Sequence, residues 1–270
     1  MKAKTLLLIL ACLGLHSAYL QAHGDLRVRI TAVTRQIEEK PSAGLYLKRG
    51  ELQQEHGEYD LALSDYQKAE ELDPTLDMIL FHRGQALFEA GRPVPARATL
   101  DQFLEKRPDH GEGYLIRARV LTALNDYAAA AKDYDRSIEF TKEPQPEHFL
   151  ERARVLEQAG DLNAAVKGLD AGMERLGAIW TLQSAALEIE VKETRYDSAL
   201  KRVDRLIGEA QRKETWQALR AEILAKAGRG DEARQAYQES LASIEALPPQ
   251  LRSPTATREL EEKVRAAATQ

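Results

Sequence analysis

The chain repeats itself about every 34 residues. Small residues recur at this spacing in two series, one in the first half and one in the second half of each copy. The two series are Gly50, Gly84, Ala118 and Ala153, and then Ala62, Ala96, Ala130, Ala165, Ala199 and Ala233. The spacing is 35 between the third and fourth copies, which indicates one inserted residue. A fixed period of this size predicts stacked supersecondary units rather than one globular core.

The composition supports a folded, helix-rich protein and limits the kinds of partner. Hydrophobic residues make up 43% of the 270 residues and charged residues 30%, which is too apolar for a disordered chain. The net charge is -5 and the pI is about 5.8, so no strongly basic surface is expected. We therefore expect no nucleic-acid partner.

Residues 1–22 have the features of a secretory signal peptide of bacterial type. Lys2 and Lys4 precede an uncharged apolar run, and Ala22 offers a cleavage site that is favoured over Ala18. The run is too short to span a bilayer, so no membrane span is expected. The sequence predicts an exported protein that is periplasmic or secreted.

The only cysteine raises an alternative to simple cleavage. Cys12 follows Ile9, Leu10 and Ala11, a sequence similar to a bacterial lipoprotein signal in which the cysteine receives a lipid anchor. Leu10 is unusual before such a cysteine, and the apolar run is very short. A soluble exported protein is therefore favoured over a lipid anchor at Cys12.

The rest of the chain divides into helical stretches. Apolar residues spaced by three and four predict an N-terminal helix within residues 23–42, and residues 248–270 predict a C-terminal capping helix. The six copies between them are 43–76, 77–110, 111–144, 146–179, 180–213 and 214–247. A turn is expected near the middle of each copy, where a left-handed residue can end a helix. The turn residues are Gly57, Gly91, Asn125, Gly160 and Gly228, whereas the fifth copy has Thr194 at this place.

The first copy carries most features of a known motif. Gly50 permits a close approach of two helices, Tyr59 follows the turn, Ala62 lies at the helix crossing, and Pro74 ends the copy. In these features the chain resembles the tetratricopeptide repeat family. The other copies match at most of the same places, whereas the fifth departs most, with Gln183 where a large apolar residue is expected.

The resemblance implies an all-α fold, a right-handed α-solenoid of about six helix pairs with capping helices at both ends. It also implies a protein–protein interaction scaffold that binds peptides or proteins along a concave face formed by the first helix of each repeat. No ligand is specified, and the lysine and asparagine pattern of repeats that bind a chaperone's C-terminus is absent.

Projection of the repeat onto that concave face gives candidate groove residues. An apolar track with two central arginines would suit a segment with hydrophobic anchors and an acidic group. The candidates are Leu47, Phe81, Gln85, Phe88, Leu115, Arg119, Leu150 and Arg154. The alternative is that these apolar residues simply pack between neighbouring first helices.

Arginines form a second regular series, directly before the small residue of the first helix. They are Arg49, Arg83, Arg117, Arg152 and Arg220. Asp65 and Asp133 lie on the second helices, which favours pairing within a repeat over an arginine ladder for an acidic ligand.

No sequence motif supports an enzyme, a cofactor or a metal site. The chain has no glycine-rich phosphate loop, no Gly-x-Ser-x-Gly and no His-Glu-x-x-His. Cleavage after Ala22 would leave His23 at the N-terminus, where its amine and imidazole together could chelate copper, although no further ligand is evident. The rival function is therefore an accessory subunit of an exported enzyme or metal-handling system.

Overall fold

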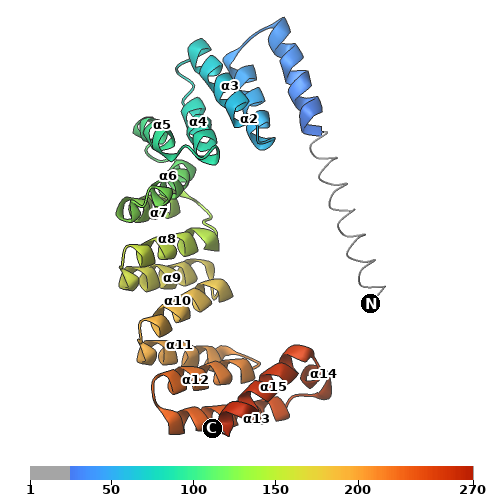
Figure 1. Ribbon diagram of the computed structural model, residues 1–270, viewed down its shortest axis with the longest axis vertical. Helices are drawn as coiled ribbons and strands as arrows, with labels where there is room; N and C mark the ends of the chain where they lie inside the picture. Colours follow the sequence, from blue (N-terminus) through green and yellow to red (C-terminus); the bar gives the residue numbers. More distant parts are fainter. Residues whose placement is uncertain (1–24, 270) are drawn as a thin grey trace. The chain divides into compact units, whose positions relative to one another are not determined.

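The computed structural model describes residues 25–269, and helices account for nearly all of this part of the chain. The predictions for residues 1–22 and for His23 lie outside the described residues. The described part contains fifteen helices and no strand, and the helices pack in consecutive pairs (Figure 1). The all-α array of helix pairs expected from the sequence is confirmed.

The chain divides into two compact units, with the boundary between Gly160 and Asp161. In the N-terminal unit a first helix, residues 25–39, precedes the paired helices. The paired helices of this unit are α2 (Ala43–Glu55), α3 (Tyr59–Leu72), α4 (Met78–Glu89), α5 (Pro93–Lys106), α6 (Gly111–Ala123), α7 (Tyr127–Phe140) and α8 (Pro146–Gln158).

The C-terminal unit begins with the helix that follows the fourth turn. Its helices are α9 (Leu162–Leu176), α10 (Trp180–Lys192), α11 (Tyr196–Glu209), α12 (Glu214–Lys226), α13 (Gly230–Glu245), α14 (Pro249–Arg252) and α15 (Thr255–Ala268). Within this unit α9 packs on α10, α11 on α12, and α12 on α13.

The turns inside the repeats adopt the left-handed backbone that the sequence predicts. Four of them use glycine, with φ between 73° and 83° at Gly57, Gly91, Gly160 and Gly228. Asn125 and Thr194 adopt the same region, with φ of 60° and 56°. A residue in this conformation ends the first helix and reverses the chain.

The close helix crossings depend on small side chains. Ala62, Ala96, Ala130 and Ala165 have no exposed surface. On the facing helix, a Cβ atom added to Gly50 would lie 2.5 Å from Cε1 of Tyr66. In the fifth repeat the place of Gly50 is taken by Leu187, and α10 and α11 pack less extensively than α12 and α13 do.

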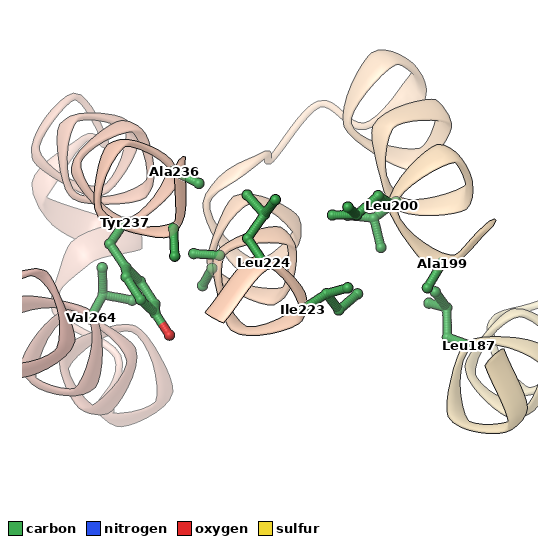
Figure 2. Close-up of a cluster of buried hydrophobic side chains, with 12 residues drawn as sticks. Leu187, Ala199, Leu200, Ile223, Leu224, Ala236, Tyr237 and Val264 are labelled. Atoms are coloured by element: carbon green, nitrogen blue, oxygen red, sulfur yellow. The ribbon is translucent and has the colours of Figure 1, made fainter. Parts of the chain in front are cut away.

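Both ends of the array are covered by an additional helix. The helix at 25–39 buries Leu26, Val33 and Ile37 against Leu52 of α2. In the C-terminal unit α15 packs on α13, and Figure 2 shows Val264 facing Tyr237 at that junction. These contacts provide each terminal repeat with the apolar neighbour that a further repeat would otherwise supply.

Candidate functional site

An apolar cleft lies between the first helices α10 and α12 of the C-terminal unit. Its volume is about 530 Å³, and its apolar wall is formed by Trp180, Leu187, Val191, Leu219 and Ile223. Leu187 and Ile223 belong to the buried core and form the floor. The indole of Trp180 is 55% exposed, so a large aromatic surface is open to a ligand.

The aromatic end of this cleft is held in place by a second tryptophan. The rings of Trp180 and Trp216 meet edge to face, with their centroids 5.0 Å apart. Trp180 is the first residue of α10, and Trp216 lies in the first turn of α12. Contact between these two rings therefore links the starts of neighbouring first helices on one face of the unit.

Charged side chains border the same cleft in two rows. Glu188 and Glu222 occupy equivalent places on α10 and α12, and Lys192 and Lys226 follow each of them by four residues. Residues four apart lie about one turn along the same helix face. Glu222 is also bound by the cap, because Nζ of Lys263 in α15 lies 2.7 Å from its Oε1.

The structure places Phe81, one of the predicted groove residues, in the core of the N-terminal unit. Phe81 is 3% exposed. Its ring centroid lies 5.5 Å from that of Phe103 on α5 and 5.2 Å from that of His110 at the start of α6. A ligand on the first-helix face would have little of this ring to contact.

Arg119, a second predicted residue, is held by acceptors of its own unit. Nε and Nη2 of Arg119 each donate to Glu151 of α8 at 2.9 Å, and the hydroxyl of Tyr134 donates to Glu151 at 2.9 Å. Burial acts to raise the pKa of Glu151, but these hydrogen bonds outweigh it and the pKa lies below its ordinary value. The guanidinium therefore links α6 to α8.

The other predicted groove residues are on the first helices of the N-terminal unit with part of each side chain accessible. Leu47, Gln85, Phe88, Leu115 and Leu150 are half-buried, and Arg154 is exposed. Nε2 of Gln85 donates to Oε1 of Glu89 at 2.9 Å. The groove formed by these residues remains a prediction.

The face between α2 and α4 is polar rather than apolar. A pocket of about 340 Å³ is lined by Glu51, Gln54, Glu55, His82, Gln85 and Glu89. Nε2 of His82 lies 3.1 Å from Oε1 of Glu51. The apolar track expected to begin here is therefore interrupted by carboxylates and amides.

The arginine series is paired with acidic side chains, as the pattern of Asp65 and Asp133 indicates. Arg49 binds Asp65 and Arg117 binds Asp133 within one repeat, each through Nε and Nη2 at 2.6–2.8 Å. The other arginines of the series pair with a second helix of the preceding repeat. These pairs are Arg83 with Glu70, Arg152 with Asp135, and Arg220 with Asp204. The predicted pairing within a repeat is therefore confirmed for Arg49 and Arg117, whereas the other three arginines pair between repeats.

The fifth repeat replaces this arrangement with a buried ion pair on its second helix. Arg202 of α11 donates to Glu190 of α10, which is 1% exposed, and to Asp170 of α9. The guanidinium forms part of the wall of a polar pocket of about 650 Å³ between α9 and α11. Its hydrogen bonds to the two carboxylates tie three helices together.

The described part of the chain offers neither a metal-binding cluster nor a helix that could span a membrane. Among residues 25–269, no group of three histidine, cysteine, aspartate or glutamate side chains is arranged to hold a metal ion. No helix in the same range is long and apolar enough to cross a bilayer.

The α10–α12 cleft was not predicted from the sequence. The fifth repeat is the least regular copy, and the apolar track was expected in the first four. A signal was nevertheless present, because Trp180, Ser184, Leu187 and Val191 follow steps of four, three and four along one helix face. Both tryptophans of the chain also lie in its fifth and sixth copies.

Comparison with known proteins identifies the family of the chain and related folds. Sequence profiles described as tetratricopeptide repeat and tetratricopeptide repeat-like domain match residues 47–94 and 81–144, and residues 145–254, respectively. No curated protein sequence matches the chain.

Several solved structures share the fold at low sequence identity. The C-terminal part of a tetratricopeptide repeat protein from Cytophaga hutchinsonii superposes with a TM-score of 0.64 at 14% identity, over 91% of this chain and 98% of the other. A tetratricopeptide repeat protein from Parabacteroides merdae gives 0.53 at 17% identity, over 92% and 96%. Naa15, in a complex with Naa10 and HypK, gives 0.54 at 15% identity, over 92% and 39%. The chain belongs to the tetratricopeptide repeat family.

Proposed function

We propose that this chain is a non-catalytic scaffold that binds a peptide or protein partner on the concave face of its first helices. The family consists of stacked helix pairs that present extended surfaces to other proteins. The Naa15 structure, which shares the fold, is a complex of proteins. A binding role therefore accords with the fold and with the known relatives.

The observation that carries this proposal is the apolar cleft between α10 and α12. Exposed aromatic and aliphatic surface is costly to leave in water, and it commonly marks an interaction site. Trp180 supplies such surface beside the half-buried Val191 and Leu219, within a hollow rather than on a flat helix face. Tryptophan is also among the residues that contribute most to protein interfaces.

The proposal includes the first-helix face of the N-terminal unit. Phe88, Leu115 and Leu150 retain accessible apolar surface there, and Arg154 retains an exposed charge. These residues offer a second binding surface on the N-terminal unit itself. Arg119 would take part only if a partner's acidic group competed with Glu151.

Site-specific photo-cross-linking tests which face binds. A benzophenone amino acid would replace Leu115 on α6 or Glu188 on α10, and, as matched controls, exposed Lys132 on α7 or Lys201 on α11. We expect cross-linked partner from the first-helix positions and little from the controls. Cross-links from Lys132 and Lys201 alone would place the partner on the second helices and contradict the proposal.

We also propose that the protein is exported, on the basis of the residues at 1–22. The charged start, the apolar run and the small residue at Ala22 support this proposal. Mass spectrometry of the mature N-terminus tests it. A chain that begins at His23 supports export, a lipidated Cys12 supports anchoring after export, and an intact Met1 contradicts both.

A further inference from the structure

The wall of the α10–α12 cleft consists of two apolar stripes with the spacing of helix-packing surfaces. On α10 the stripe is Trp180, Leu187 and Val191, with Ser184 completing steps of four, three and four. On α12 the wall is formed by Leu219 and Ile223, four residues apart, and Trp216, three residues before Leu219, continues this apolar stripe beyond the cleft lining. This is the pattern with which one helix packs against another.

The cleft follows α10 along its whole length and α12 along its second half, from Leu219 to Lys226. Its lining on α10 extends from Trp180 to Lys192, which corresponds to about 18 Å of helix at 1.5 Å per residue. An amphipathic helix of about three turns has the same length and offers apolar side chains at the same intervals. A helix laid in a groove is one of the recurrent modes of peptide recognition.

The charges at the cleft define how such a helix would lie. Glu188 and Glu222 are nearer the middle of α10 and α12, and Lys192 and Lys226 are one turn closer to the C-terminal ends. Helices favour acidic residues in their first turn and basic residues later. A helix with its acidic first turn over Lys192 and Lys226, and a basic residue over Glu188 and Glu222, runs antiparallel to α10 and α12.

We propose that the α10–α12 cleft binds an amphipathic helix of a partner protein, about three turns long and antiparallel to α10 and α12. Its apolar stripe would pack on Trp180, Val191 and Leu219, with an acidic first turn and basic residues one to two turns later. This inference rests on the proposed scaffold function and specifies the class of partner. The polar pocket between α2 and α4 lacks the apolar stripes and would not accept the same helix.

Two synthetic peptides of identical composition test the inference. Each has 16 residues, no tryptophan and leucines spaced by four, three and four. The forward peptide has glutamates in its first turn and lysines one to two turns later, and the exchanged peptide has these charges swapped. Because Trp180 lines the cleft and the second tryptophan of the chain, Trp216, contacts it, the tryptophan emission reports occupation of the cleft.

We expect the forward peptide to shift the emission to shorter wavelength in a saturable way, as Trp180 becomes covered. The exchanged peptide should bind about tenfold more weakly, because it replaces favourable charge pairs by like-charge contacts. Absence of a shift with either peptide at millimolar concentration would overturn the inference. Equal affinity for both peptides would overturn it as well, because the charges would then not select the helix.

A charge-reversal variant supplies the decisive comparison. In Glu188→Lys/Lys226→Glu both changes are on exposed side chains, and neither residue forms an ion pair among residues 25–269. Each of the two levels of the cleft border then carries one acidic and one basic side chain, so we expect the variant to bind the two peptides with similar affinity. Lys201→Glu on α11 is the matched control and should keep the wild-type preference. An unchanged preference in the double variant would contradict the proposed orientation and the proposal with it.

Loss of the apolar wall should remove binding of both peptides. Leu219→Asp places a charge in the cleft. Circular dichroism melting shows whether this variant still folds. If it does not fold, the peptide preference of the Glu188→Lys/Lys226→Glu variant still tests the inference. Size-exclusion chromatography of the peptide-free protein tests a different occupant. A dimer that Leu219→Asp abolishes would identify a second copy of the chain as the occupant of the cleft and overturn the proposal.

The scaffold proposal and this inference can fail separately. Photo-cross-links from Leu115 together with failure of both peptides would leave the scaffold function intact and exclude the helix from the cleft. Absence of cross-links from both first-helix positions would contradict the scaffold function itself.

Discussion

Arg49 holds the carboxylate of Asp65 by two hydrogen bonds, from Nε to Oδ2 at 2.6 Å and from Nη2 to Oδ1 at 2.7 Å. The side chain of Asp65 is only 6% exposed, so the pair joins α2 to α3 beneath the surface. Arg49→Ala should lower the free energy of unfolding by about 1.5–3 kcal/mol, because a buried carboxylate loses charge-assisted hydrogen bonds. Urea denaturation followed by circular dichroism measures the change.

A double variant separates the ion pair from simple packing. Arg49→Met/Asp65→Leu removes both charges and keeps apolar volume, and replacement of a buried pair in this way is often close to neutral. We therefore expect the double variant to be more stable than Arg49→Ala. Equal losses in the two variants would show that the pair contributes little and that the arginine stem provides the stability.

The helix crossings at Ala130 and Ala165 should not tolerate larger side chains. Both residues have no exposed surface. Ala130→Leu and Ala165→Leu should each cost about 1–3 kcal/mol through overpacking. Thermal melting checks the prediction, with Ala128→Leu on the exposed face of α7 as a control that should melt normally. Unchanged melting of both buried variants would mean that the crossings are not tightly packed.

Phe81 and Phe88 should respond differently to truncation. Phe81 is buried among Phe103 and His110, so Phe81→Ala should cost about 3–5 kcal/mol of stability. Phe88 is half-buried at the edge of the same cluster, and Phe88→Ala should cost less. Urea denaturation of the two variants tests this difference. Similar losses would indicate that Phe88 is as much a part of the core as Phe81.

Acid should weaken the N-terminal unit through His148 and His82. Burial is the main cause that lowers the pKa of each imidazole, against a smaller opposing effect of Glu151 on His148 and of Glu51 on His82. A histidine whose pKa is lower in the folded than in the unfolded protein contributes its full stability above the ordinary imidazole pKa of 6.5. This contribution is lost as the pH falls from that value through the pKa of the folded protein. The free energy of unfolding should therefore decline between pH 7 and pH 5.

A matched variant isolates the contribution of His148. Its Nδ1 accepts the backbone N–H of Gln145 at 3.3 Å, at the start of α8. Glutamine also accepts such a bond but does not titrate, so His148→Gln should keep the stability measured at pH 7 and lose less of it at pH 5. An identical acid response in the variant would assign the effect to other groups.

Removal of the C-terminal helix should promote self-association. Deletion of residues 253–270 removes Val264, which is fully buried, and exposes the side of Tyr237 that it covers. Exposed repeat ends associate because they present an apolar face. Light scattering after size-exclusion chromatography should detect larger species. Arg258→Ala, on the exposed face of α15, is the control and should stay in the same association state as the wild type. A deletion variant that is monomeric and as stable as the wild type would contradict a capping role.

The helix pairs were predictable because their signals are local. The 34-residue period, the left-handed turn residues and the alanines at the crossings each depend on neighbours within one repeat. The pairing of Arg49 with Asp65 was predictable for the same reason, because both residues lie in one helix pair.

The accessible surface was harder to predict because it depends on neighbouring repeats. Projection of a repeat indicates the face of Phe81 but not that Phe103 and His110 from later helices cover it. The cleft also depends on several helices, since Trp180 and Leu219 come from different repeats. Thr194 stands where the other copies have glycine or asparagine, so its left-handed conformation could not be predicted from its residue type.

The paired arginines have a consequence for how an array of this kind can change length in evolution. Duplication of a repeat such as 43–76 adds Arg49 together with Asp65. The positive charge of the added arginine is therefore neutralised by an aspartate within the same duplicated segment. Copy number can then vary without accumulating unbalanced charge between the helices. Exposed positions such as Glu188 and Lys226 lie outside these pairs, so they can change independently of the contacts that hold the repeats together.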